Sequence, residues 1–207
     1  MKSLRTAGGL VLFAALASLP VAYLLRPEAP PPPALYPMPA FSLTSEQGAP
    51  FGAKDVAGKV LVANFIFTSC PTVCPALTAH MARIQKRFAA EDRVHLLSFS
   101  VDPKNDTPAA LRAYGEKFGQ DPRRWTFLTG DLAAIESAVE QGFKIRMEGA
   151  ADPDATAFDI VHGEHFVVAD GHGVIRGYYQ PTAEDLERLA DDVERLLAEP
   201  LDQSPTP

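Results

Sequence analysis

The stretch Val60–Met81 restricts the fold more than any other part of the chain. It begins with Val60–Phe67, an apolar run rich in β-branched and aromatic residues, which is typical of a strand covered on both faces. Pro75–Phe88 then shows the apolar spacing of a helix. Both cysteines of the chain, Cys70 and Cys74, lie between these two segments. The stretch therefore predicts a buried strand, a turn that carries two thiols, and a helix.

The rest of the folded region continues this alternation of strands and helices. After an irregular hairpin at Phe41–Lys59, the pattern predicts strands at Arg93–Val101, Trp125–Leu128, His165–Ala169 and Val174–Tyr179. It predicts helices at Thr107–Phe118, Asp131–Gln141 and Thr182–Leu197, and a polar surface loop at Gly149–Asp159. This order predicts an α/β fold with a mixed central sheet flanked by helices on both faces.

The N-terminal region has the composition of a membrane anchor followed by a stalk. Lys2 and Arg5 precede an apolar run, Gly8–Leu25, that is long enough to span a bilayer. We therefore expect an anchor at residues 1–26, with a secretory signal cleaved after Ala17 as the alternative. The prolines of residues 27–40 favour an extended linker. Residues 41–198 then form the domain, and 199–207 a disordered tail. Either reading of the leader places the domain on the periplasmic side of a bacterial inner membrane.

Charge and cysteine count exclude several classes of function. The net charge of −7 provides no basic surface, so binding to nucleic acid has no electrostatic support. Two cysteines are too few for a disulfide-stapled scaffold and, alone, for a structural zinc site with four ligands. Copper binding, thiol redox chemistry and an inert disulfide remain open.

The spacing of the cysteines suits either a reversible disulfide or two sulfur ligands on one metal. In a helical segment, residues four apart lie on one face, with Cβ atoms about 5–6 Å apart. A helix N-terminus stabilises the thiolate, which is both nucleophile and ligand. Soft thiolates favour Cu(I), and an added imidazole allows Cu(II). Of the five histidines, His80, His95 and His172 are more consistent with structural or surface positions, which leaves His162 and His165.

Three segments together resemble the Sco/SenC family. They are FTSCPTVCPAL after the buried strand, FSVDPKNDTPAAL at the end of the next strand, and a histidine before the late hairpin. Members of this family are membrane-anchored, thioredoxin-like proteins that bind copper and help to assemble the binuclear copper (CuA) site of cytochrome c oxidase. The resemblance covers about Phe41–Leu197. It implies a thioredoxin-like fold, copper as the bound metal, and Cys70 and Cys74 as two of its ligands.

The resemblance also selects a third ligand. The family's histidine lies eleven residues before the glycine that ends the late hairpin turn, and counting back from Gly173 gives His162. His165 is the alternative third ligand. Where the family commonly has Asp directly before this histidine, the chain has Val161. A ligating imidazole usually donates to an acceptor, so Asp159 or Glu164 is expected to take that role.

Two functions follow from this set of residues. The first is a copper metallochaperone that binds one Cu(I) or Cu(II) ion through Cys70, Cys74 and His162. Its partners would be the copper-site subunit of a respiratory oxidase and other periplasmic copper carriers. The alternative is an enzyme, a dedicated thiol–disulfide oxidoreductase that reduces the cysteines of that subunit. Three residues between the cysteines argue against a general reductase, which carries two. A peroxidase ranks lower, and the sequence does not separate a copper-responsive redox sensor from these functions.

One further motif has a plainer interpretation. Asp102 and Asp106, in VDPKND, could be metal ligands, but acidic residues at such a position more often end a strand and order the turn before a helix. We therefore predict a local structural role for both.

Overall fold

A mixed eight-stranded sheet forms the centre of the fold, in the order β1–β10–β9–β4–β5–β6–β2–β3. The structure is a computed structural model that describes residues 29–149 and 160–200. The strands are β1 (Tyr36–Pro37), β2 (Ser42–Ser45), β3 (Pro50–Gly52), β4 (Val60–Ile66), β5 (Val94–Ser100), β6 (Trp125–Thr129), β9 (Phe166–Ala169) and β10 (Val174–Tyr179). Strands β4, β5 and β6 run parallel, and the remaining pairs are antiparallel. Every residue of β4, β5 and β6 is buried, as their apolar sequences predict.

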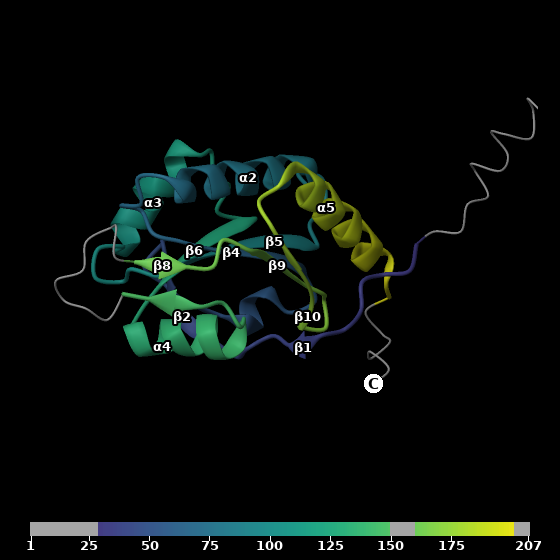
Figure 1. The fold of residues 1–207 in the computed structure, drawn as a ribbon, viewed down its shortest axis with the longest axis horizontal. Coiled ribbons are helices and arrows are strands. Elements are labelled where there is room, and N and C mark those ends of the chain that lie inside the picture. The colour runs from purple at the N-terminus through teal and green to yellow at the C-terminus, as the bar shows by residue number, and fades with distance from the viewer. Residues whose placement is uncertain (1–28, 150–159, 201–207) are drawn as a thin grey trace, which may run out of the picture. The chain divides into compact units, whose positions relative to one another are not determined.

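Helices cover both faces of this sheet (Figure 1). They are the 3₁₀ turn η1 (Ala53–Val56), the α-helices α2 (Val73–Arg87), α3 (Pro108–Lys117), α4 (Leu132–Glu136) and α5 (Ala183–Ala198), and the π-helical segment η2 (Ser137–Gly142). Helices α2 and α5 lie side by side, and α4 lies on the opposite face of the sheet (Figure 1). The predicted α/β architecture with a mixed, helix-flanked sheet is confirmed.

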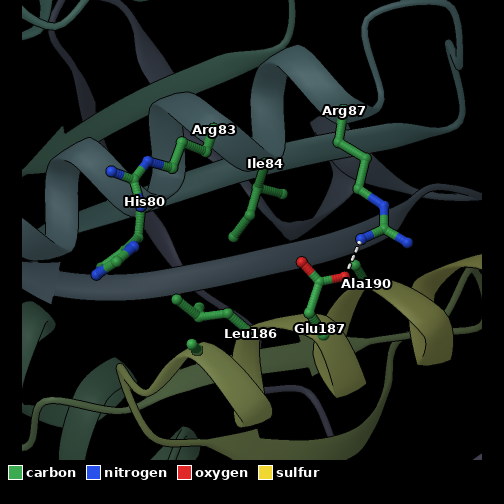
Figure 2. A pocket seen from close by; sticks show the side chains of 8 residues that line it. His80, Arg83, Ile84, Arg87, Leu186, Glu187 and Ala190 are labelled. Carbon is green, nitrogen blue, oxygen red and sulfur yellow. Dashed lines mark hydrogen bonds and ion pairs between the residues drawn. The ribbon is translucent and has the colours of Figure 1, made fainter.

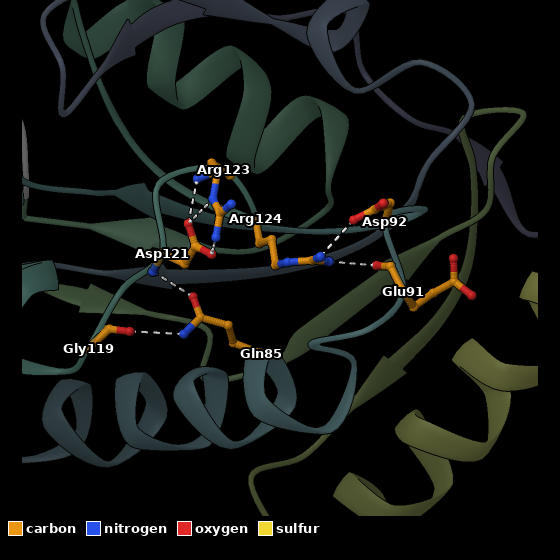
Figure 3. Close-up of polar contacts among 7 residues, drawn as sticks. All are labelled: Gln85, Glu91, Asp92, Gly119, Asp121, Arg123 and Arg124. Atoms are coloured by element: carbon orange, nitrogen blue, oxygen red, sulfur yellow. Dashed lines mark hydrogen bonds and ion pairs between the residues drawn. The ribbon is translucent and has the colours of Figure 1, made fainter.

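Helix α2, which follows the cysteine turn, is fixed to the sheet along its length. Its apolar side chains Leu77, Met81 and Ile84 are buried. Near its C-terminus, Gln85 Nε2 donates to the Gly119 carbonyl at 2.9 Å, and Gln85 Oε1 accepts the Asp121 N–H at 2.8 Å (Figure 3). These bonds hold the C-terminal half of the helix, and the buried Leu77 and Met81 hold the half that follows the cysteine turn.

The structure differs from the sequence prediction at four places. Helix α2 begins at Val73, two residues early, because Pro75 fits the first helical turn, where its missing N–H is not needed. Tyr36–Pro37 forms an edge strand within the segment predicted as a linker. The helix predicted at Asp131–Gln141 becomes α4 followed by a π-helical turn. A separate two-stranded sheet, β7 (Met147–Glu148) and β8 (Val161–His162), was not predicted.

The N-terminal region is outside what the structure describes. In residues 29–149 and 160–200, no helix is long and apolar enough to cross a membrane. The predicted anchor at 1–26, most of the predicted loop at Gly149–Asp159, and most of the predicted tail lie outside these ranges.

A buried arginine ties the start of the described chain to its end. The Arg176 guanidinium contacts Asp170 at 2.7 Å and Glu199 at 2.9 Å, and Nε donates to the Pro32 carbonyl at 2.8 Å. Arg176 and Asp170 are 7% and 2% exposed. One cation therefore joins the segment before β1, the β9–β10 hairpin and the end of α5.

Replacing Arg176 should destabilise the domain strongly. Arg176→Ala leaves Asp170 buried and without its cation, so we expect the free energy of unfolding to fall by about 3–5 kcal/mol. Chemical denaturation measures this change. The control is Arg146→Ala, which removes an exposed ion pair to Glu148 and should leave stability nearly unchanged. An equal loss of unfolding free energy in the two variants would contradict the assignment of Arg176 as the residue that joins these three segments.

Candidate metal centre

The two cysteines lie where β4 passes into α2. Cys70 is in the turn, with its N–H donating to the Phe67 carbonyl at 3.3 Å, and Cys74 is in the first turn of α2. Both thiols are free, and they are 7% and 0% exposed. The side chains interact with each other. The structure therefore brings the two cysteines together at the helix N-terminus, as their spacing predicts.

His162 reaches the same place from a separate element. Its Nε2 lies 3.5 Å from the Cys74 sulfur, although the two residues are 88 positions apart. The ring packs edge-on against Phe67 and is 9% exposed. Backbone pairing with Met147 in the β7–β8 sheet fixes the position of His162.

The orientation of the His162 ring suits it for accepting a proton or a metal. Nδ1 lies 3.2 Å from the Gly163 carbonyl, which can only accept, so Nδ1 carries the proton and donates. In the neutral ring this leaves the lone pair of Nε2 directed at the Cys74 sulfur. Within the described residues the acceptor is this backbone carbonyl rather than Glu164, whereas Asp159, the other expected acceptor, lies outside them. No side-chain pattern in the sequence could have identified this group.

The two thiols have opposite acid–base properties. Partial burial opposes ionisation of Cys70, but hydrogen bonds from the backbone N–H groups of Cys74 and Thr72, and from their side chains, outweigh it and lower the pKa of Cys70. Burial raises the pKa of Cys74, and the adjacent Cys70 acts in the same direction. Burial also lowers the pKa of His162, which favours the neutral imidazole. Cys70 is therefore the reactive thiol of the pair.

Cys74 contacts both Cys70 and His162, so these three side chains form two pairs. In the parts of the chain that the structure describes, no group of three or more His, Cys, Asp or Glu side chains is already gathered as a metal site. Two sulfurs and one imidazole nevertheless form a donor set that suits a soft transition metal.

The other histidines lie elsewhere. His165 Nε2 is 2.7 Å from Gln180 Nε2, and His95 Nε2 is 3.0 Å from the Thr126 hydroxyl. His80 lines a groove of about 250 Å³ between α2 and α5 (Figure 2). His172 is partly buried in the β9–β10 turn. Of these four, none contacts either sulfur within the described residues, so the geometry favours His162 over His165.

Thiol reactivity should distinguish the two cysteines. Because the thiolate is the nucleophile and the pKa of Cys70 is lowered, iodoacetamide at neutral pH should modify Cys70 at least about tenfold faster than Cys74. The rate at Cys70 should already rise at a pH below the pKa of a free cysteine. Peptide mass spectrometry measures both rates, with Cys70→Ser as the control that leaves only the slow thiol. Equal labelling would contradict the assigned difference.

Comparison with known proteins identifies the family. The model of the SCO1/SenC family matches residues 31–198 of the 207. The SCO1 protein homolog of Bacillus subtilis is 32% identical over 161 residues, which cover 75% of this chain and 83% of that protein.

Solved structures agree with this result. BsSco, described as a member of the Sco family of cytochrome c oxidase assembly proteins with a disulfide switch, matches with a TM-score of 0.70 and 28% identity, over 82% of this chain and 99% of that one. Bradyrhizobium japonicum ScoI, solved with copper bound, matches with a TM-score of 0.61 and 27% identity, over 77% and 98%. The chain belongs to the SCO1/SenC family.

Proposed function

We propose that the chain is a copper metallochaperone that binds one copper ion through Cys70, Cys74 and His162. The observation that carries this proposal is the 3.5 Å contact between Cys74 Sγ and His162 Nε2, at the end of the helix that also holds Cys70.

The donor set fits copper better than other metals. Two thiolates favour Cu(I), and the neutral imidazole extends the set to Cu(II). Zinc sites of structural type need a fourth protein ligand, which the two pairs around Cys74 do not supply. The two thiols must release their protons to act as ligands, whereas His162 needs no deprotonation, because Nε2 is already free.

The relatives support a proposal for the cargo and its destination. A related ScoI holds copper, and BsSco belongs to the Sco family of cytochrome c oxidase assembly proteins. We infer that this chain delivers copper to the CuA subunit of a respiratory oxidase and exchanges it with other periplasmic carriers. We further propose that residues 1–26 anchor the chain in the bacterial inner membrane and that residues 27–40 lead to a periplasmic domain at 41–198.

The Cys70–Cys74 pair also supports a second candidate function. Cys70 has a lowered pKa and lies against Cys74, which is the arrangement of an attacking and a resolving thiol. A dedicated thiol–disulfide oxidoreductase acting on the oxidase subunit would use this pair and would not need His162.

Copper titration of the full-length protein tests the ligand set. The wild type should bind one equivalent of copper. His162→Ala should weaken binding by at least about 100-fold, because removing a ligand costs more than removing a group that orients one. The matched control is His165→Ala, which removes a nearby histidine and should leave affinity unchanged. Competition with a copper chelator gives the affinities.

Two outcomes would redirect the assignment. Unchanged copper affinity in His162→Ala would show that this residue is not a ligand. Absence of copper binding in the wild type, together with equal reduction of an oxidised CuA peptide by the wild type and His162→Ala, would favour the oxidoreductase.

A further inference from the structure

A buried carboxylate outside the candidate metal centre is bonded directly to the cysteine turn. Asp106 is 0% exposed, and it lies in the turn between β5 and α3, 36 residues beyond Cys70. The sequence predicts only a local role for it, in ordering that turn. Its backbone does this, since its N–H donates to the Asp102 carbonyl at 2.9 Å. Its side chain bonds instead to groups outside its own turn.

The hydrogen bonds to Asp106 come from neutral donors on two other segments. The Thr68 N–H lies 3.1 Å from each carboxylate oxygen, and the Thr68 hydroxyl donates to Oδ1 at 2.5 Å. The Ser100 hydroxyl donates to Oδ2 at 2.6 Å. Burial raises the pKa of Asp106, and the hydrogen bonds from Ser100 and Thr68 oppose this shift because they stabilise the ionised carboxylate. Asp106 therefore joins the end of β5 to the residue that begins the cysteine turn.

This connection matters because the two thiols are held by different means. Cys74 belongs to α2, where the Thr78 hydroxyl donates to its carbonyl at 2.8 Å. Cys70 lies in the preceding turn, and Thr68 is two residues before it. The carboxylate of Asp106 is what fixes this turn to a neighbouring strand. The Asp106–Thr68 bonds thus contribute to the position of Cys70 relative to Cys74, although Asp106 forms no hydrogen bond to either sulfur and acts on Cys74 only through its charge, which raises the pKa of that thiol.

We propose that Asp106 is a positioning residue for the Cys70–Cys74 pair: by holding Thr68, it keeps Cys70 close to Cys74. The inference deepens the proposed function, because a dithiol held together serves both as two ligands on one copper ion and as a reversible disulfide. Only its consequence for copper binding rests on the proposed function. The effect on the dithiol itself follows from the contacts alone.

The dithiol–disulfide equilibrium with glutathione tests this proposal without copper. In the reaction, the protein dithiol and one glutathione disulfide give the protein disulfide and two glutathione thiols, so the cysteines lose two electrons and two protons and glutathione gains them. Closer thiols have a higher effective concentration toward each other, which favours the protein disulfide. Loss of the hydrogen bonds between Asp106 and Thr68 should therefore disfavour the disulfide and make its midpoint potential less negative.

We expect Asp106→Ala in the full-length protein to lower this equilibrium constant about tenfold, which corresponds to a rise of about 30 mV in midpoint potential. Asp106→Asn keeps an acceptor for the Thr68 N–H and should fall between the wild type and Asp106→Ala. The matched control is Glu46→Ala. Glu46 is also a buried carboxylate, 1% exposed, but it accepts from the Phe127 N–H and from Gln120 at 3.0 Å each, away from the cysteine turn.

An unchanged equilibrium constant in Asp106→Ala, or an equal fall in Glu46→Ala, would overturn the proposal. If Asp106→Ala does not fold, Thr68→Val removes the hydroxyl bond while keeping the side-chain shape, and a fall of about threefold is then the expected result. No change in Thr68→Val would equally overturn it. A wild type that binds no copper would refute the metallochaperone alone, because the glutathione measurement judges Asp106 independently.

Discussion

The parallel pairing of β4 with β5 is the constraint on which the site depends. In this ladder Ile66 pairs with Ser100, and the Val101 N–H donates to the Ile66 carbonyl at 2.9 Å. Parallel strands end at the same edge of a sheet, so the turns that follow them must meet. One turn carries the cysteines and the other carries Asp106. The turn after β5 can therefore hold the turn after β4 in place, even with a side chain as short as aspartate.

The histidine reaches this edge by a different route. His162 belongs to the small β7–β8 sheet, which is separate from the main sheet, and its partner strand follows the π-helical segment η2. The Tyr178 hydroxyl donates to the Phe143 carbonyl at 3.0 Å and so connects this region to β10. The sulfurs thus sit on the rigid end of a sheet and helix, while the imidazole sits on a short two-stranded ribbon. The three side chains therefore come from three places in the fold, which are the turn after β4, the first turn of α2 and the β7–β8 sheet.

The sequence predicted those parts of the structure that depend on local pattern. The buried strands, the helices that alternate with them and the dithiol turn follow from apolar periodicity, capping residues and the placement of Cys70 and Cys74. His162 required the family resemblance, because nothing in the residues around it separates it from His165. The role of the Asp106 side chain and the acceptor role of the Gly163 carbonyl could not be predicted. Both depend on which segments meet in space, and a backbone carbonyl is present at every position.

The opposite acid–base properties of the two thiols bear on both functions proposed for the site, metal binding and thiol redox chemistry. Burial keeps Cys74 protonated, whereas hydrogen bonds favour the thiolate of Cys70. In either proposed function, an incoming copper ion or disulfide would meet the sulfur of Cys70 first, and Cys74 would follow only when its proton is lost. The Nε2 lone pair of His162 lies 3.5 Å from the Cys74 sulfur, but burial raises the pKa of Cys74 and lowers that of His162, so transfer of the thiol proton to the imidazole is unfavourable. The imidazole therefore stays neutral, which is the state in which Nε2 could bind a metal.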